Sequence, residues 1–295
     1  MANDGYIRIG ELSRRVGVSP ELLRAWERRY GILEPGRSAG RFRLYSDADV
    51  ARVQSMQANL AQGLSAAEAA RRALDQPETA VVNAAPSGSL LEPAVAELWS
   101  AVDTFDDARA HAALDRLLAA FGLETVLRDV VLPFLRELGD RWAGGEVTVA
   151  QEHFASNLLR GRLLALARGW NRGPGPHAVL AAAPGELHDL GLVTFGLALR
   201  ERGWSITFLG ADTPVPTVAD AAERVSAELV VVTATTASPL RAVADDLASI
   251  GKRRRLALAG AGASPAMCEL AHAEFLDADP IEAARALADA RPRMP

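Results

Sequence analysis

Residues 183–191 read APGELHDLG and directly follow an apolar run, Ala178–Ala182, that has the pattern of a buried strand. A helical pattern continues over residues 190–201. His188 is therefore predicted to lie on a loop at the carboxyl end of a strand, where open α/β sheets bind their ligands. Its imidazole can coordinate a transition metal, and Glu186 can orient the ring through the other nitrogen.

β-prone and helical patterns alternate through the C-terminal part of the chain. The predicted strands are His177–Ala182, Ser205–Leu209, Leu229–Thr233, Arg255–Ala259 and Glu274–Leu276. The predicted helices lie near residues 190–202, 214–226, 238–250, 264–272 and 280–290. This alternation is typical of a doubly wound parallel sheet. Because no Gly-x-Gly-x-x-Gly opens the first helix, nucleotide-dependent hydride chemistry is not expected.

Composition sets broad limits. The chain has 295 residues and 49% hydrophobic content, enough for two or three globular domains. No run approaches the ~18 consecutive apolar residues of a membrane span, and the first residues lack the pattern of a signal peptide. Cys268 is the only cysteine, so neither a disulfide within the chain nor a cysteine metal site is expected. These features predict a cytoplasmic protein without a membrane partner.

Charge is distributed unevenly along the chain. The net charge is −5, but residues 1–72 carry 12 Arg and no Lys against 8 acidic residues, a balance of +4. The remainder has a balance of −9. A polyanionic partner would therefore be expected to meet the N-terminal part.

Residues 11–30 have the pattern of two short helices joined by a tight turn. Gly17 is predicted to end the first helix. Ser19 and Pro20 supply an N-cap and a first helical residue for the second helix. This arrangement is typical of a helix-turn-helix.

The next segment, residues 35–45, reads PGRSAGRFRLY. Its glycines indicate a hairpin and its arginines suit a wing that grips phosphate. Ser46 is predicted to cap a further helix. The ordered elements resemble the winged-helix domain of the MerR family over about residues 6–74. RAWERRYG (24–31) and RFRLYS (41–46) are the specific parts of that resemblance.

The resemblance implies operator double-stranded DNA as a partner. The residues expected to contact it are Arg24, Arg28 and Tyr30 on the recognition helix and Arg37, Arg41 and Arg43 in the wing. Trp26 is expected in the core instead. The alternative is a solvated basic helix in which Glu27 offsets Arg24.

MerR-type repressors usually pair through a long helix after the winged helix. Here the helical pattern stops near Leu74, and residues 76–89 have the composition of a linker. Dimerisation is therefore expected to depend on the rest of the chain.

Helical spacing of apolar residues dominates the middle of the chain. Four helices are predicted near residues 92–103, 105–120, 123–142 and 148–168, as in a four-helix bundle. Pro133 is expected to kink or interrupt the third.

Trp142 closes the third predicted helix, and Glu152 and His153 lie in the first turns of the fourth. With a turn between them, these side chains can converge on one end of the bundle. Taken alone, Trp142 can be an ordinary buried aromatic and the Glu-His pair an ordinary helix start.

Two further resemblances connect these features. The Glu-x-His-x-x-Gly segment at Glu186, His188 and Gly191 resembles the Asp-x-His-x-x-Gly signature of base-off/His-on corrinoid proteins. Trp142 followed after nine residues by Glu152-His153 resembles the signature of the CarH/LitR family of cobalamin-dependent transcriptional repressors.

The resemblance implies adenosylcobalamin as the cofactor, placed between the bundle and the sheet domain, with His188 as the lower axial ligand of cobalt. Trp142, Glu152 and His153 would face the adenosyl group. The remaining cofactor-binding residues expected from the two resemblances and the loops are Glu186, Asp189, Gly191, Thr233, Thr235, Gly260 and Gly262. The same glycines can also simply turn a strand into a helix.

In this family the dark, cofactor-bound form is a tetramer that represses transcription, and light dissociates the tetramer. One departure concerns this light response. In the best-known light-sensing members a histidine follows the tryptophan and becomes a second axial ligand after illumination, whereas this chain has Ala143. His153 or water is the alternative ligand, or the chain senses cobalamin with an altered light response.

These features divide the chain into a MerR-type winged-helix DNA-binding domain (1–75), a linker (76–90), a four-helix bundle (91–172) and a Rossmann-like cobalamin-binding domain (173–295). The predicted function is an adenosylcobalamin-dependent, light-responsive transcriptional repressor, not an enzyme, that binds DNA as a cofactor-controlled homo-oligomer. The alternatives are a corrinoid methyl carrier or enzyme subunit, and a MerR-type sensor of cobalamin or another ligand without a light response.

Overall fold

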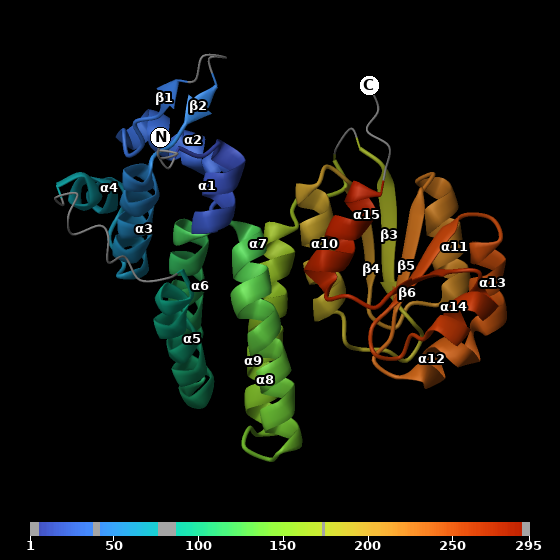
Figure 1. Ribbon diagram of the computed structural model, residues 1–295. Coiled ribbons are helices and arrows are strands. Elements are labelled where there is room, and N and C mark those ends of the chain that lie inside the picture. Colours follow the sequence, from blue (N-terminus) through green and yellow to red (C-terminus); the bar gives the residue numbers. More distant parts are fainter. Residues whose placement is uncertain (1–5, 38–41, 76–86, 173–174, 291–295) are drawn as a thin grey trace. The chain divides into compact units, whose positions relative to one another are not determined.

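The computed structural model describes residues 6–37, 42–75, 87–172 and 175–290 (Figure 1). The chain forms two compact units, Met1–Ala155 and Ser156–Pro295. None of the helices in the described ranges has the length and apolar character that crossing a bilayer requires.

The first unit begins with a winged helix-turn-helix. Its elements are α1 (Ile9–Val16), α2 (Pro20–Tyr30), β1 (Gly36–Arg37), β2 (Arg43–Leu44), α3 (Asp47–Ala61) and α4 (Ala66–Asp75). Gly17 ends α1 in the left-handed conformation, with a φ of 64°. The Ser19 hydroxyl accepts a hydrogen bond from the Leu22 amide at 3.2 Å, and Pro20 is the first residue of α2. The predicted turn and N-cap are therefore confirmed.

The wing is a two-stranded antiparallel hairpin. Arg37 pairs with Arg43, and the described part of the hairpin excludes Arg41. The helix after the wing begins with a capping box, in which Ser46 and Asp49 exchange hydrogen bonds between side chain and backbone. Asp49 is only 1% exposed and also accepts a hydrogen bond from the Glu34 amide at 2.9 Å. This carboxylate thus ties the segment before the wing to α3.

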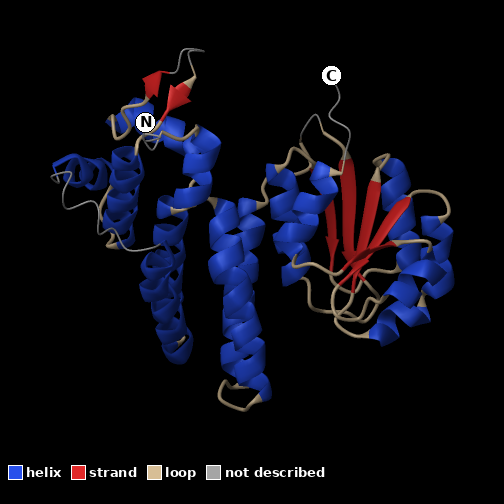
Figure 2. Ribbon diagram, in the orientation of Figure 1, coloured by secondary structure: helices blue, strands red, loops and turns tan. Residues whose placement is uncertain are grey.

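Five helical segments follow, and Figure 2 shows that this part of the chain contains helices and loops only. They are α5 (Ser87–Thr104), α6 (Asp107–Ala120), α7 (Leu123–Val126), α8 (Leu132–Ala143) and α9 (Val149–Leu166), with a π-helical segment, η2 (Leu127–Val131), joining α7 to α8. Helix α9 crosses the boundary between the two units.

The third predicted helix is thus interrupted ahead of Pro133. Proline has no amide hydrogen and cannot donate to the carbonyl of Asp129. The Leu132 amide bonds instead to the Leu127 carbonyl, five residues back, which is the π-helical pattern. The expected irregularity is confirmed, but it takes the form of a π-helical segment.

Within the first unit, the helix-turn-helix contacts the helical segment directly. Gln57 on α3 is fully buried, and its Nε2 donates to the carbonyls of Val16 (2.8 Å) and Ala120 (3.0 Å). Those carbonyls lie at the C-terminal ends of α1 and α6, where no helical donor remains. The Gly122 amide also donates to the Gly17 carbonyl at 2.8 Å.

The second unit contains a five-stranded parallel sheet of order β4-β3-β5-β6-β7. The strands are β3 (His177–Ala182), β4 (Ser205–Gly210), β5 (Leu229–Thr233), β6 (Arg255–Ala259) and β7 (Glu274–Leu276). The helices are α10 (Leu190–Glu201), α11 (Val215–Arg224), α12 (Ala237–Ala242), α13 (Ala244–Gly251), α14 (Pro265–Ala271) and α15 (Pro280–Asp289). Helices α10 and α15 pair on one face and α11, α13 and α14 cover the other (Figure 1).

The predicted doubly wound parallel sheet is confirmed. One predicted helix, over residues 238–250, is in fact two helices that break at Val243, where φ is −122°. The strand order reverses at β3, because β4 lies on one side of it and β5 on the other. Loops that leave the carboxyl ends of strands at such a point form the usual ligand crevice of this fold.

Candidate functional site

The loop after β3 is held by hydrogen bonds to the loop after β4. Gly185 has a φ of 79°, and its amide donates to Asp212 Oδ1 at 2.8 Å. The Asp212 amide in turn donates to the Glu186 carbonyl at 2.9 Å. The loop that carries His188 therefore has a defined backbone path.

Glu186 is the polar centre of this loop, and it is 3% exposed. Its Oε1 is 2.6 Å from Nδ1 of His188 and accepts from the His188 amide at 2.8 Å. Its Oε2 accepts from the Thr235 amide at 2.5 Å and from the Thr235 hydroxyl at 2.6 Å. The structure thus brings together three predicted site residues from the loops after β3 and β5.

Burial opposes ionisation of Glu186. The hydrogen bonds from Thr235 and His188 outweigh that effect and lower the pKa of Glu186 from 4.5 to about 2. An ionised carboxylate accepts a hydrogen bond from Nδ1–H of a neutral imidazole, which leaves the Nε2 lone pair for a metal. The His188 side chain is 78% exposed. The imidazole ring of His188 is therefore exposed to solvent, while its Nδ1 atom is held by Glu186.

The predicted glycines and threonine of the loops after β5 and β6 differ in their surroundings. A Cβ atom at Gly260 would collide with the Ala234 carbonyl, and one at Gly262 would collide with the Thr236 carbonyl. These glycines are thus required by the close approach of the loops after β5 and β6. The Thr233 hydroxyl is buried without a hydrogen-bond partner among the described atoms.

Gly191, in the first turn of α10, differs from those glycines. A Cβ atom there would meet only the Pro280 side chain, at 4.0 Å, which is ordinary contact. The neighbouring protein atoms therefore do not require glycine at this position.

Asp189 is 3% exposed and directly follows His188. Its carboxylate accepts from Nε and Nη2 of Arg160 at 3.0 and 2.7 Å. Sequence reasoning did not find Arg160, since a pair of residues 29 positions apart leaves no local pattern. The burial of Asp189, which makes a nearby cation necessary, is itself known only from the fold.

Trp142, Glu152 and His153 belong to the first unit. Trp142 lies in the last turn of α8 and is 50% exposed, which argues against an ordinary buried aromatic. Nε2 of His153 is 3.5 Å from the Glu152 carboxylate, and the His153 side chain is 69% exposed. Ala143, the last residue of α8, is also exposed.

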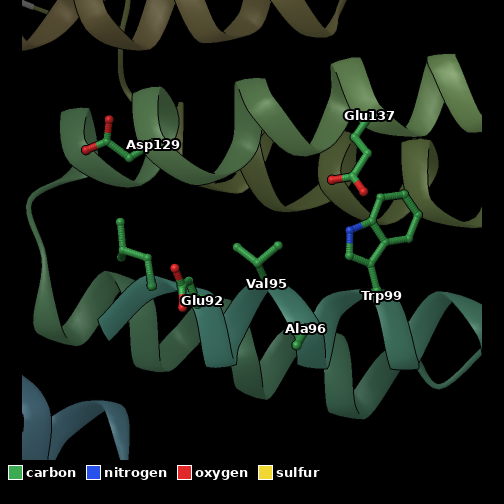
Figure 3. A pocket seen from close by; sticks show the side chains of 7 residues that line it. Glu92, Val95, Ala96, Trp99, Asp129 and Glu137 are labelled. Atoms are coloured by element: carbon green, nitrogen blue, oxygen red, sulfur yellow. The ribbon is translucent and has the colours of Figure 1, made fainter. Parts of the chain in front are cut away.

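A cavity of about 460 Å³ lies between α5 and the η2–α8 segment (Figure 3). It is lined by Leu91, Glu92, Val95, Ala96, Trp99, Asp129 and Glu137. The Arg141 guanidinium lies 4.0 Å from the Trp99 ring centroid. None of the predicted site residues lines this cavity, so it is separate from the site that the sequence predicts.

The predicted DNA-contacting residues are mostly exposed. Arg24 and Arg28 on α2 and Arg37 and Arg43 in the hairpin face solvent, Tyr30 is half-buried, and Arg41 lies outside the described residues. Trp26 is 4% exposed, which confirms its place in the core.

Glu27 does not pair with Arg24. The Glu27 carboxylate lies 3.1 Å from Nε of Arg43 and accepts a hydrogen bond from the Tyr45 hydroxyl at 3.1 Å. Arg24 lies beside a different acid, with its Nη1 atom 4.0 Å from the Glu21 carboxylate. The pairing of Glu27 with Arg24 that the alternative of a solvated basic helix assumed is therefore not found. Burial, with the charge of Glu27, raises the pKa of Tyr45 from 10.0 to about 12.

Within the described ranges, no three His, Cys, Asp or Glu side chains gather as a metal site. The side chains of this part of the chain therefore do not form a site that would enclose a free metal ion. A metal that brings its own macrocycle needs only one protein nitrogen, which His188 can supply.

Family models match almost the whole chain. A model of the MerR HTH family regulatory protein matches residues 7–76, and two models of the B12 binding domain match residues 94–167 and 176–290. The monomethylamine corrinoid protein of Methanosarcina barkeri has a similar structure, with a TM-score of 0.54 and 19% identity. The match covers 66% of this chain and 96% of that one. This likeness shows a shared fold.

Together these findings define a DNA-binding transcriptional regulator with a cobalamin-binding domain, and not an enzyme. The chain is 36% identical over 220 residues to the HTH-type transcriptional repressor CarH of Myxococcus xanthus, covering 72% of this chain and 73% of that protein. It is also 36% identical over 228 residues to CarA of the same organism, covering 76% and 75%. The chain therefore belongs to the CarH/CarA-like family of MerR-type, B12-binding transcriptional regulators.

Proposed function

We propose that this protein is an adenosylcobalamin-dependent, light-responsive transcriptional repressor that binds operator DNA as a cofactor-controlled homo-oligomer in the cytoplasm. The carrying observation is the buried Glu186 carboxylate, which fixes Nδ1 of His188 and leaves Nε2 on a side chain that is 78% exposed. The relatives CarH and CarA are named as transcriptional repressors, which supports the same direction of control here.

The residues of the sheet domain suit a large cobalt corrin. When bound, this group supplies a cobalt centre with a photolabile cobalt–carbon bond. His188 would hold the cobalt, and Glu186 with Thr235 would keep the ring of His188 in one orientation. The buried Thr233 hydroxyl has no hydrogen-bond partner among the described atoms, as expected where a ligand supplies one.

Trp142, Glu152 and His153 would contact the adenosyl group of the cofactor in this proposal. An aromatic ring that is 50% exposed at a helix end offers an apolar surface for a flat adenine group. Glu152 supplies a hydrogen-bond acceptor and His153 a nitrogen at the start of α9.

DNA binding is assigned to residues 1–75. Arg24 and Arg28 with Tyr30 enter the major groove, and Arg37, Arg41 and Arg43 hold phosphates. Several such modules in one oligomer bind more tightly than one, because linkage raises the effective concentration of each. Anything that stabilises the oligomer, including the cofactor, therefore stabilises the DNA complex.

Ala143 favours a second candidate, a cobalamin-dependent regulator without a light response. Alanine cannot coordinate cobalt, so it cannot replace the histidine that follows the tryptophan in the best-known light-sensing members. His153, ten residues further along, is the nearest histidine in the sequence that could do so.

The test is size-exclusion chromatography and operator binding of protein reconstituted with adenosylcobalamin, in darkness and after green light. We expect a large assembly in darkness that light dissolves, with a parallel loss of DNA affinity. An assembly that forms with cobalamin but ignores light would establish the second candidate. Unchanged assembly and DNA affinity with and without cobalamin would contradict both.

A further inference from the structure

Asp189 is a buried carboxylate at the position before helix α10. A residue in this position often caps the helix with its side chain, but Asp189 makes no such hydrogen bond. Its carbonyl accepts from the Val193 amide at 2.9 Å, so its backbone begins the helix. The carboxylate is therefore held by something other than the helix that it precedes.

That partner is Arg160 on α9, and both residues belong to the second unit. Nε of Arg160 lies 3.0 Å from each oxygen of Asp189, and Nη2 lies 2.7 Å from Oδ2. Such a two-nitrogen fork fixes the direction of a carboxylate as well as its charge. A carboxylate that is 3% exposed is costly without this compensation.

His188 lies between two fixed carboxylates. Glu186, two residues before it, is fixed by Thr235, and Asp189, the residue after it, is fixed by Arg160. The side chain of His188 is itself bonded to Glu186. With Arg160 removed, the loop keeps its side-chain attachment before the histidine and the backbone hydrogen bond of Asp189 to α10, and it loses the side-chain attachment after the histidine.

We propose that Arg160 is a positioning residue for cobalt coordination, which acts on His188 through Asp189. The inference rests on the proposed binding of cobalamin by His188. It also revises the role of Asp189, whose carboxylate is committed to Arg160 and serves the loop, not the cofactor. Glu152 and His153 lie in the first turns of the same helix, in the part that belongs to the first unit.

The test compares Arg160→Gln and Arg160→Lys with Arg168→Gln, a change of an exposed arginine just beyond the same helix. Full-length protein is titrated with hydroxocobalamin. Removal of a group that orients a metal ligand weakens metal binding by roughly 10–100-fold. We expect a loss of that size for Arg160→Gln, an intermediate loss for Arg160→Lys, because lysine keeps the charge without the fork, and none for Arg168→Gln.

The identity of the lower ligand is read from the EPR spectrum of bound cob(II)alamin. The protein is labelled with histidine that contains the heavy nitrogen isotope, which splits the signal into doublets, while the cofactor's own base gives triplets. We expect doublets for the unchanged protein and a mixture for Arg160→Gln. Unchanged affinity and pure doublets in Arg160→Gln would overturn the proposal.

The double variant Arg160→Gln, Asp189→Asn removes both charges. It distinguishes a role of the pair in stability alone from a role in positioning His188. If the pair only balances charge, this variant recovers thermal stability and histidine ligation together, which would overturn the proposal. We expect recovery of stability without recovery of histidine ligation.

Hydrogen exchange of the cobalamin-free protein gives an independent readout. Amides of residues 186–193 should exchange faster in Arg160→Gln than in Arg168→Gln. If the unchanged protein binds no cobalamin, the proposed function fails. The exchange experiment then still decides whether Arg160 orders the loop, and equal exchange would overturn that part too.

Discussion

At Glu186, four hydrogen bonds from two residues converge on one buried carboxylate. Each oxygen accepts two donors, so the side chain has one orientation only, and the ring of His188 takes its orientation from it. The pKa of Glu186, lowered to about 2 by these hydrogen bonds, keeps the carboxylate ionised at neutral pH. In the proposed cobalamin site, Glu186 would therefore act on cobalt only through the ring of His188.

Replacing Glu186 with Gln tests this arrangement. An amide keeps the shape but offers one acceptor oxygen, so the donors of either His188 or Thr235 lose their partner. We expect cobalamin to bind roughly 10–100-fold more weakly, measured by spectroscopic titration. Glu223→Gln, an exposed change on α11, is the control and should bind as the unchanged protein does. Equal affinity of the two variants would contradict the role of Glu186.

Tyr45 gives a prediction for alkaline pH. Its pKa is raised from 10.0 to about 12 by burial and by Glu27, so the folded protein favours the neutral phenol. The stabilisation is complete below pH 10 and is lost as pH rises toward about 12, because the unfolded chain ionises first. The difference in melting temperature between the unchanged protein and Tyr45→Phe should therefore shrink across this window. A constant difference would show that the phenol does not titrate as described.

At the scale of elements, the turn of the helix-turn-helix is fixed by its packing as well as by its caps. Gly17 ends α1, and a Cβ atom there would lie 2.9 Å from the Thr125 hydroxyl of α7. Gln57 joins the ends of α1 and α6. The turn before the recognition helix is thus in contact with the helical segment of the same unit.

Replacing Gly17 or Gly31 with alanine separates the free-energy cost of a strained backbone from that of a steric clash. Gly17 and Gly31 both have a left-handed backbone, with φ of 64° and 65°, but no atom lies within 4 Å of a Cβ at Gly31. Gly31→Ala should lower the free energy of unfolding by about 1–2 kcal/mol for backbone strain alone. Gly17→Ala should cost more, since Thr125 must also move, as measured by urea unfolding. Equal costs would mean that α7 does not pack against this turn.

The elements show what the sequence could predict. Caps and glycines at Gly17, Ser19 and Ser46 are local signals, and the elements that they predict were found. The break at Val243 and the π-helical form of the interruption before Pro133 depend on hydrogen bonds to other turns, which spacing does not encode. Arg160 could not be found, because its partner is distant in the sequence and specified only by the fold.

For the whole molecule, the charge is divided between a basic N-terminal domain that matches a DNA-binding family and an acidic remainder. The N-terminal excess of arginine attracts DNA of any sequence through release of counterions. Family membership establishes the regulator and its cobalamin domain, and the residues of the sheet domain indicate how cobalt would be held. How cofactor and light change assembly is the part that sequence patterns predict least, because Ala143 departs from the family.

Arg28 tests the electrostatic part of DNA binding. Arg28→Ala should reduce the slope of log affinity against log salt concentration by about one for a duplex of random sequence, since on DNA that lacks the operator bases this arginine would neutralise one phosphate. Arg285→Ala, which removes an exposed arginine on α15, is the control and should leave the slope unchanged. Equal slopes for the two variants would exclude Arg28 from the interface. Fluorescence anisotropy over a range of salt concentrations provides the measurement.

Whether His188 ligates cobalt is tested most directly by the visible absorption spectrum of protein reconstituted with cobalamin, with and without His188→Ala. His272→Asn is the control, because it changes another exposed histidine of the sheet domain, and asparagine tolerates the left-handed backbone there. We expect a histidine-coordinated spectrum for the unchanged protein and the control, and its loss in His188→Ala. A histidine-coordinated spectrum that survives His188→Ala would contradict cobalt ligation by His188.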